Sequence, residues 1–230
     1  HAVALVQRPQ PVHACTALEA LSSMLRTPSF TKRAAALLAA RLADLPVLLT
    51  TSCTHALELA ALLLDVGPGD EVIVPAFTFV STASAFALRG ARVVFADVDP
   101  ATLNLDPAAA AAHVTPRTKA IACVHYAGVA CDLAALGALG VPLVEDNAHG
   151  LFGRWRDRPL GTFGALATQS FHDTKNLGCG EGGALVLGDR RFVERATVRQ
   201  HGIDAANLIG GYRTLGAAIR TAVGTVAPAR

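Results

Sequence analysis

The run Val141-Pro142-Leu143-Val144-Glu145-Asp146 is short, almost continuously apolar and ends in two acidic residues, with His149 three residues further along. Such a run predicts a strand that is buried on both faces, which is typical of parallel sheets. In open parallel sheets, ligands bind beyond the carboxyl ends of the strands. We therefore expect the acidic end of this strand to face a ligand crevice.

The same pattern recurs along the chain and alternates with Ala- and Leu-rich segments of helical spacing. The other apolar runs predict strands at Glu71–Pro75, Arg92–Asp97, Lys119–Val124, Ala165–Phe171 and Gly183–Gly188. The segments between them predict helices at Thr54–Val66, Thr78–Leu88, Pro107–His113 and Leu133–Leu139. This alternation favours an α/β fold, a mostly parallel sheet that helices cover on both faces.

The composition excludes several classes of protein. Of the 230 residues, 52% are hydrophobic and 17% are charged, so the chain is too apolar to be disordered. Charges such as Arg41 and Glu58 interrupt the richest apolar stretches before they reach the roughly 20 residues of a membrane span. A net charge of +2 without a long basic run argues against binding to nucleic acid. Five cysteines without a C-x-x-C pair indicate a reducing cytoplasm.

A glycine-rich stretch, Gly178-Cys179-Gly180-Glu181-Gly182-Gly183, matches the spacing found in dinucleotide sites. In those sites the glycines follow a strand and open a helix, whose N-terminus receives the pyrophosphate. Here they precede Ala184-Leu185-Val186-Leu187, which predicts a strand. The order disfavours a dinucleotide site and predicts a tight loop whose backbone approaches another segment closely.

Lys175 is one of only three lysines, and it follows the predicted strand Ala165–Phe171. It should therefore lie at the same edge of the sheet as Asp146. A desolvated lysine beside an acid can form a Schiff base, and in pyridoxal phosphate (PLP) enzymes an acid pairs with the pyridinium nitrogen. The pattern alone leaves two other readings open: a solvated loop lysine, and an aspartate that caps a helix or forms a salt bridge.

Six motifs, in order between about Phe30 and Gly202, resemble those of the DegT/StrS-type sugar aminotransferases, which are PLP enzymes of fold type I. They are Thr51-Ser52-Cys53-Thr54-His55-Ala56-Leu57-Glu58, Pro75-Ala76-Phe77-Thr78-Phe79-Val80-Ser81-Thr82, Val124-His125-Tyr126-Ala127-Gly128-Val129-Ala130-Cys131-Asp132, Glu145-Asp146-Asn147-Ala148-His149-Gly150, Ser170-Phe171-His172-Asp173-Thr174-Lys175-Asn176 and Gly180-Glu181-Gly182-Gly183. Within the family, the Ser-Cys-Thr and His-Tyr-Ala-Gly-Val-Ala-Cys stretches most resemble transaminases that act on dTDP-4-keto-6-deoxy-D-glucose.

The resemblance implies roles for the residues at the end of the first strand and for the lysine. Lys175 would bind PLP covalently and then shuttle a proton during the reaction. Asp146 would keep the pyridine nitrogen protonated, and His149 would lie near the phenolic oxygen of the cofactor. His149 could instead be a structural histidine, and we expect Glu145 to be structural.

Other motifs imply how the rest of the cofactor is held. Phe79 would stack on the ring, unless it is a core aromatic residue. The backbone and side chains of Cys53 and Thr54, at the start of a helix, would receive the phosphate. Ser170 would add a hydroxyl, and Cys53 is expected to act as a small spacer and not as a nucleophile.

Taken together, the resemblance implies a cytoplasmic homodimer that moves the amino group of L-glutamate through PLP to the 4-keto carbon of a dTDP-linked 4-keto-6-deoxyhexose, for a surface polysaccharide or antigen. A related PLP sugar dehydratase is one alternative, but those relatives replace the Schiff-base lysine with histidine. A truncated remnant or partner that keeps the fold without turnover is the other.

The motifs also divide the chain into segments. Residues 1–45 predict an N-terminal helical segment, with helices at Thr16–Arg26 and Thr31–Ala43. Residues 46–202 would form the PLP-binding large domain, and residues 203–230 would be a remnant of the start of a small C-terminal domain. Asn147 departs from the family, which usually has a small residue there, so its buried polar group would need a partner.

Overall fold

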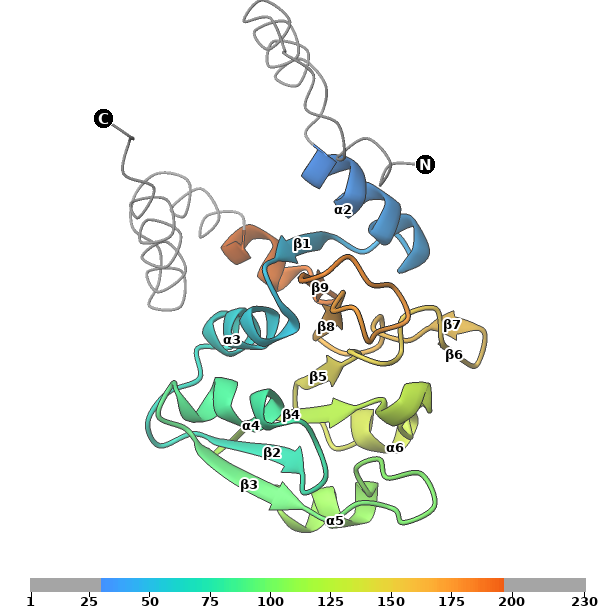
Figure 1. Ribbon diagram of the computed structural model, residues 1–230. Helices are drawn as coiled ribbons and strands as arrows, with labels where there is room; N and C mark the ends of the chain where they lie inside the picture. The colour runs from blue at the N-terminus through green and yellow to red at the C-terminus, as the bar shows by residue number, and fades with distance from the viewer. Residues whose placement is uncertain (1–29, 197–230) are drawn as a thin grey trace, which may run out of the picture.

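The computed structural model describes residues 30–196, which form a seven-stranded sheet flanked by helices (Figure 1). The strand order across the sheet is β1-β9-β8-β5-β4-β2-β3. The strands of this sheet are β1 (Val47–Thr50), β2 (Glu71–Pro75), β3 (Arg92–Ala96), β4 (Thr118–Val124), β5 (Leu143–Asp146), β8 (Leu166–Ser170) and β9 (Gly183–Leu187).

Five neighbouring strands, β8, β5, β4, β2 and β3, run parallel. Strand β9 is antiparallel to both of its neighbours, β8 and β1. The carboxyl ends of the parallel strands therefore meet at one edge, where the sequence places its chemically active side chains. The α/β fold class expected from the sequence, a mostly parallel sheet with helices, is confirmed.

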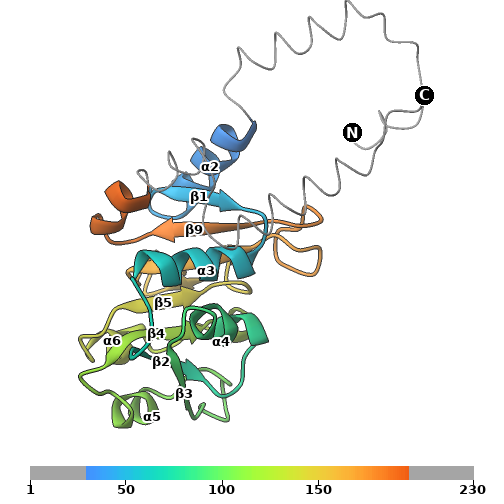
Figure 2. The same ribbon diagram turned by 90° about the vertical axis from the view of Figure 1, so that its left-hand side faces the viewer.

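Helices cover both faces of the sheet (Figure 2). They are α2 (Phe30–Arg41), α3 (Cys53–Leu63), α4 (Val80–Ala87), α5 (Pro107–Ala112) and α6 (Leu133–Gly137), with a short 3₁₀ turn, η2 (Tyr126–Gly128). One core contains apolar residues of α3 and α4, and another contains those of α5 and α6. Along β4, Ala120 and Ala122 belong to the first core, whereas Ile121 and Cys123 belong to the second. This alternation follows from the two-residue period of a strand.

The same alternation separates the two acids at the end of β5. Cys123 pairs in register with Glu145, and Val124 pairs with Asp146. The carboxylate of Asp146 accepts a hydrogen bond from Thr82 in α4, so it lies on the α3/α4 side. The carboxylate of Glu145 meets the loop that precedes β8, on the other side of the sheet.

Two strand features were not predicted from the sequence. Strand β1 lies in an apolar stretch next to a helix, and only its pairing with β9 shows that it is a strand. The hairpin of β6 (Arg154–Trp155) and β7 (Arg158–Pro159) turns at Arg156 and Asp157, which both have positive φ. The helix predicted at Thr31–Ala43 is α2, whereas the helix predicted at 16–26 and the segment 203–230 lie outside the described residues.

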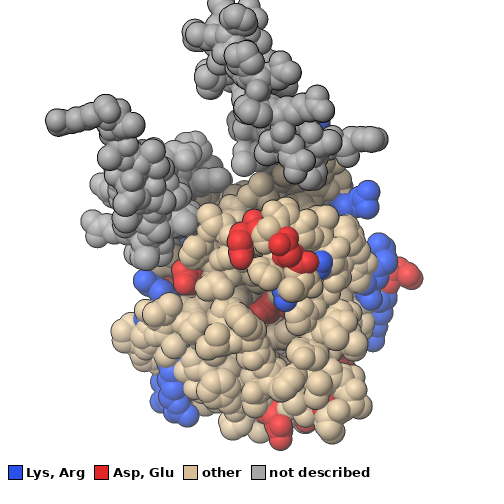
Figure 3. All heavy atoms as spheres, viewed as in Figure 1, with Lys and Arg blue, Asp and Glu red and all other residues tan. Residues whose placement is uncertain are grey.

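Two surface properties follow from the described part of the chain. No helix within residues 30–196 is long and apolar enough to cross a bilayer. On the face in Figure 3, basic side chains lie mainly at the margins and most of the surface is uncharged.

Candidate active site

A cavity of about 640 Å³ opens at the carboxyl edge of the sheet. Segments that follow β1, β2, β4, β5 and β8 line it, together with the residues just before β9. All seven residues that were predicted to have a role lie in its wall: Cys53, Thr54, Phe79, Asp146, His149, Ser170 and Lys175. The fold therefore brings the predicted set together from four separate segments, which follow β1, β2, β5 and β8.

Asp146 is a buried carboxylate at the base of this cavity, with 4% of its surface exposed. Its Oδ2 accepts a hydrogen bond of 2.7 Å from the Thr82 hydroxyl, and its Oδ1 accepts one of 3.2 Å from the backbone N–H of Ala148. Among the described residues, no lysine, arginine or histidine forms an ion pair with it. A buried carboxylate that has only neutral donors favours a cationic ligand, because a cation offsets the cost of burying the charge.

The Cys53 thiol lies beside this carboxylate. Its Sγ is 3.9 Å from Asp146 Oδ1 and 3.4 Å from Thr168 Oγ1. Burial raises the pKa of the Cys53 thiol far above its ordinary range, and the negative charge of Asp146 raises it further. The thiol therefore stays protonated, which is consistent with a spacer and weak donor and not with a nucleophile.

The start of α3 is arranged to receive an anion. Ser52 caps the helix, because its Oγ accepts the N–H of His55 and its carbonyl accepts the N–H of Ala56. The N–H groups of Cys53 and Thr54, in the first turn of the helix, are thus left for a ligand at the positive end of the dipole.

Gly183, the first residue of β9, presses against this helix start. A Cβ at Gly183 would lie 2.4 Å from the carbonyl carbon of Ser52 and 2.5 Å from the nitrogen of Cys53. Only glycine permits such an approach. The predicted close approach of the glycine loop is therefore confirmed, and the loop leads into a strand, as the sequence indicates.

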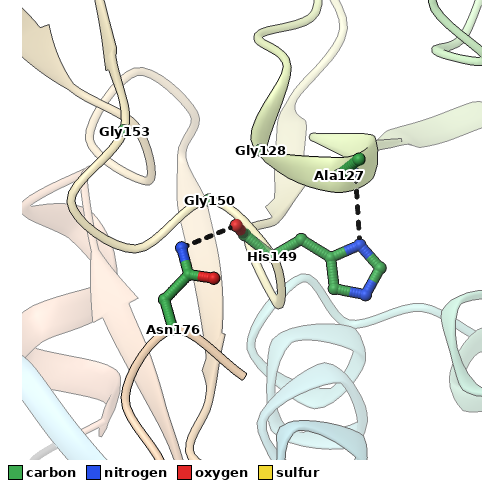
Figure 4. A pocket seen from close by; sticks show the side chains of 6 residues that line it. All are labelled: Ala127, Gly128, His149, Gly150, Gly153 and Asn176. Carbon is green, nitrogen blue, oxygen red and sulfur yellow. Dashed lines mark hydrogen bonds between the residues drawn. The ribbon is translucent and has the colours of Figure 1, made fainter. Parts of the chain in front are cut away.

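His149 is held at both its ring and its backbone (Figure 4). Its Nδ1 accepts the N–H of Ala127 at 3.3 Å, and its carbonyl accepts a hydrogen bond of 3.0 Å from Asn176 Nδ2. Because Nδ1 is an acceptor, the neutral ring carries its proton on Nε2. Burial lowers the pKa of His149 and the positive charge of Lys175 lowers it further, although Asp146 opposes this shift. The ring therefore favours its neutral form.

Lys175 lies in the loop between β8 and β9. Its neighbour Asn176 also donates a hydrogen bond of 2.9 Å to the carbonyl of Leu151, so one amide group ties the lysine loop to the loop after β5. These two loops also line a smaller cavity of about 370 Å³, which His149 and Asn176 both border (Figure 4). Lys175 and His149 thus occupy segments that are fixed to each other.

Phe79 and Ser170 complete the predicted set. Phe79 precedes the first residue of α4, and 71% of its side chain is exposed, which excludes the core-aromatic alternative. Its ring is available to stack on a ligand in the cavity. Ser170 is the last residue of β8, is 7% exposed and lies in the cavity wall.

Glu145 differs from Asp146 in having a full set of partners. Its Oε1 accepts the N–H groups of Phe163 and Gly164, both at 2.6 Å. Its Oε2 accepts the N–H of Gly161 at 2.9 Å and lies 2.8 Å from His125 Nε2. The carboxylate fixes the loop before β8, which agrees with the structural part expected for it.

The partner that Asn147 needs is present for its amide nitrogen, whereas its Oδ1 is buried without a hydrogen bond among the described residues. Its Nδ2 donates to the carbonyl of Leu160 at 3.2 Å and to Gln169 Oε1 at 3.0 Å. The polar residue that departs from the family pattern therefore joins a buried amide pair with Gln169.

Sequence reasoning did not single out Thr78, Thr82 or Asn176. The two threonines are four residues apart at the start of a predicted helix, a spacing that places side chains on one helical face. That spacing, directly after a strand, was the available signal. Asn176 follows the predicted lysine, but nothing in the sequence indicates which carbonyl groups its amide reaches.

Comparison with known proteins places this site in a family. Residues 13–222 match the model of the DegT/DnrJ/EryC1/StrS aminotransferase family. The chain is 51% identical over 146 residues to the 3-amino-5-hydroxybenzoate synthase of Amycolatopsis mediterranei, an alignment that covers 62% of this chain and 38% of the relative. It is 44% identical over 160 residues to the spore coat polysaccharide biosynthesis protein SpsC of Bacillus subtilis, with coverage of 67% and 41%.

Solved structures agree with this placement. A crystal structure of 3-amino-5-hydroxybenzoic acid synthase superposes with a TM-score of 0.71 at 41% identity and covers 84% of this chain and 53% of that one. Spr1654 of Streptococcus pneumoniae, solved in its PLP form, has a TM-score of 0.70 at 27% identity and covers 82% and 54%. The chain thus spans about two fifths of the length of the curated relatives and about half that of the solved chains.

The residues of the cavity fit PLP. The unpaired anion of Asp146 suits a protonated ring nitrogen, the start of α3 suits a phosphate, and Lys175 supplies an amine in the same wall. This fit agrees with the family match and with the cofactor-bound neighbours. The chain therefore belongs to the DegT/DnrJ/EryC1/StrS aminotransferase family, and its cofactor is pyridoxal phosphate.

Proposed function

We propose that this protein transfers the amino group of L-glutamate to the 4-keto carbon of a dTDP-linked 4-keto-6-deoxyhexose, as a step in the synthesis of a surface polysaccharide or antigen. The observation that supports this most is the convergence of Lys175 and the unpaired, buried Asp146 on one cavity. When bound, PLP supplies an electron sink that lets an amino group pass from donor to acceptor.

The side chains at the base of the cavity then perform the proton chemistry. Lys175 would hold the cofactor through its amine, and the same amine would move a proton from the α-carbon of the donor. Asp146 keeps the ring nitrogen protonated. His149, whose Nδ1 accepts the N–H of Ala127, would donate its Nε2–H to the phenolic oxygen.

The remaining residues hold the cofactor and orient it. The N–H groups of Cys53 and Thr54 and the hydroxyl of Ser170 bind the phosphate. Phe79 packs against the ring face and excludes water from it. We expect the protein to act as a homodimer, because Phe79, Val80 and Leu88, which lie at the two ends of α4, are each at least 70% exposed and a partner surface would cover them. We also expect a cytoplasmic location, as the cysteine content indicates.

A second acceptor follows from the similarity to 3-amino-5-hydroxybenzoate synthase, at 51% identity over the aligned region. Its named product is an aminated ring that carries a hydroxyl and a carboxylate and no nucleotide. A carbocyclic keto acid is therefore the alternative acceptor for the same lysine, ring and donor chemistry.

Attachment at Lys175 is tested by borohydride reduction after reconstitution with PLP. We expect the visible absorbance band of the bound cofactor to disappear and the label to be found on the peptide that contains Lys175. Lys119 and Lys32 are internal controls in the same digest. A label confined to either of them would disprove the assignment.

The acceptor is tested with the protein expressed from its complete reading frame. Release of 2-oxoglutarate from L-glutamate is measured with dTDP-4-keto-6-deoxy-D-glucose and, separately, with a carbocyclic keto acid. Turnover with the dTDP-sugar alone supports the proposal, and turnover with the keto acid alone supports the second acceptor. Labelling at Lys175 without turnover on either would indicate a non-catalytic member that keeps the cofactor site.

A further inference from the structure

Two threonine hydroxyls form a chain that ends on Asp146. Thr78 Oγ1 donates to Thr82 Oγ1 at 2.8 Å, and Thr82 Oγ1 donates to Asp146 Oδ2 at 2.7 Å. Thr82 is completely buried in the first turn of α4, and Asp146 ends β5. The contact joins residues that are 64 positions apart, so the fold and not the local sequence creates it.

The order of donors and acceptors fixes the direction of this chain. A threonine hydroxyl has one proton to donate. Because an ionised carboxylate can only accept, Thr82 donates its proton to Asp146 and must then accept the proton of Thr78. Hydrogen bonds linked in this way polarise one another, and the effect is greatest in a buried, low-dielectric environment.

The other groups within hydrogen-bonding distance of the carboxylate are also neutral. Ala148 donates its backbone N–H at 3.2 Å, and the Cys53 thiol lies at 3.9 Å. A lysine or arginine here would keep Asp146 ionised too, but it would also neutralise the charge that a cationic ligand needs. Neutral donors stabilise the ionised carboxylate without competing for its charge.

We propose that Thr82, oriented by Thr78, is a positioning residue that holds Asp146 ionised and aimed at the ring nitrogen of PLP. This inference rests on the part proposed for Asp146. Without the hydroxyl, the ion pair between carboxylate and ring nitrogen loses a stabilising donor. The proton they share then moves toward the carboxylate and away from the nitrogen.

The experiment uses the protein reconstituted with PLP that carries ¹⁵N in its ring, and it measures the ¹⁵N chemical shift. In Thr82→Val, which has nearly the same shape, we expect the balance between protonated and unprotonated nitrogen to move about tenfold toward the unprotonated form, the equivalent of one pKa unit. Thr82→Ser restores the hydroxyl and should restore the parent chemical shift. Affinity for PLP, measured by fluorescence titration of the apoprotein, should fall in Thr82→Val and recover in Thr82→Ser.

One further variant, Asp146→Asn, separates this inference from the role proposed for Asp146. Asp146→Asn should move the chemical shift more than Thr82→Val does. If Asp146→Asn changes it and Thr82→Val does not, the part given to Thr82 is wrong although that of Asp146 stands. If Asp146→Asn leaves it unchanged, both are wrong.

A matched control tests whether the effect is specific to Thr82, and a second variant is used if Thr82→Val does not fold. Thr162 is also a buried threonine, 2% exposed, but its hydroxyl donates to the carbonyl of Pro159, away from the cavity. Thr162→Val should leave the chemical shift unchanged, whatever it does to stability. If Thr82→Val does not fold, Thr78→Val decides, because it breaks the chain one link earlier: a smaller change in the same direction supports the inference, and no change overturns it.

Discussion

The two acids that end β5 are neighbours in sequence and opposites in their surroundings. Glu145 accepts three backbone N–H groups and faces His125 on one side of the sheet. Asp146, on the other side, has a hydroxyl, one backbone N–H and a distant thiol, and it borders a cavity. Both are buried carboxylates at a strand end, so residue type and position do not distinguish them. The number and charge of their partners do, because a saturated carboxylate has no capacity left for a ligand.

Each acid lies near a histidine, and the two histidines share one feature. His125 Nδ1 accepts the N–H of Cys131 at 3.2 Å, and His149 Nδ1 accepts the N–H of Ala127 at 3.3 Å. In each ring Nδ1 is an acceptor, so the proton that the ring donates lies on Nε2. His125 directs it to Glu145, where it completes a closed network, whereas His149 lies in the cavity wall. The same hydrogen bond from a backbone N–H to Nδ1 thus occurs in the structural pair of His125 and Glu145 on one side of the sheet and beside the open cavity on the other.

The largest effect is expected from Asp146→Asn, measured on the half-reaction with L-glutamate. The ring nitrogen would lose its anionic partner, so the rate should fall on the order of 10³-fold. Stability of the apoprotein should stay the same or rise by about 1 kcal/mol, because an unpaired buried charge is removed. A variant that reacts as fast as the parent would show that Asp146 does not act on the cofactor.

The opposite result is expected from Glu145→Gln. The side-chain amide would turn an N–H₂ group toward backbone donors that now meet a carboxylate. The free energy of unfolding, measured with a denaturant, should fall by about 3 kcal/mol. Glu194 is exposed, so Glu194→Gln serves as the control and should change stability by less than about 0.5 kcal/mol. A loss that small for Glu145→Gln would remove the distinction between the two acids.

The sequence allowed much of this site to be predicted because its chemistry lies at the ends of strands. Strand ends are recognisable from apolar runs, and parallel strands end at one edge, so Asp146 and Lys175 were expected to meet. The family motifs added Cys53, Thr54, Phe79, His149 and Ser170, and all of these lie in the same cavity wall. Their individual roles stay predictions.

What the sequence did not reveal depends on contacts between distant segments. Strand β1 is defined by its pairing with β9, more than 130 residues later. The hydroxyl of Thr82 finds Asp146 only once α4 packs on the sheet, and Asn176 finds its two carbonyl groups only once the loops meet. No local sequence pattern identifies the hydrogen-bond partner of either residue, because threonine and asparagine side chains also cap helices and stabilise turns.

An intermediate effect is expected from Asn176→Ala, which releases the lysine loop on the Asp146 side. Two donors are lost, so stability should fall by about 1–2 kcal/mol and PLP affinity by roughly tenfold. Asn104 provides the control on the other side of the sheet, because it also joins two loops, donating to Val129 and accepting from Tyr126. Asn104→Ala should lose similar stability and keep the rate of borohydride trapping at Lys175. Equal trapping rates in both variants would show that the Asn176 tie does not position the lysine.

The smallest effect is expected from the titration of His149. Burial and the charge of Lys175 lower the pKa of this ring, with Asp146 in opposition, so the folded protein binds its proton less readily than the unfolded chain does. The stability that the neutral ring contributes is therefore fully present above the ordinary histidine pKa of about 6.5 and is lost as pH falls through the lowered value. Protonation of Nδ1 would also displace the N–H of Ala127.

The free energy of unfolding should thus fall more steeply from about pH 7 to pH 5 in the parent than in His149→Gln, which cannot titrate there. The other histidines titrate in both proteins, so the difference between the two curves isolates His149. Parallel curves would show that this ring is as easily protonated in the folded protein as in the unfolded chain. The surroundings of His149 would then not lower its pKa, and this difference from the closed network of His125 would be removed.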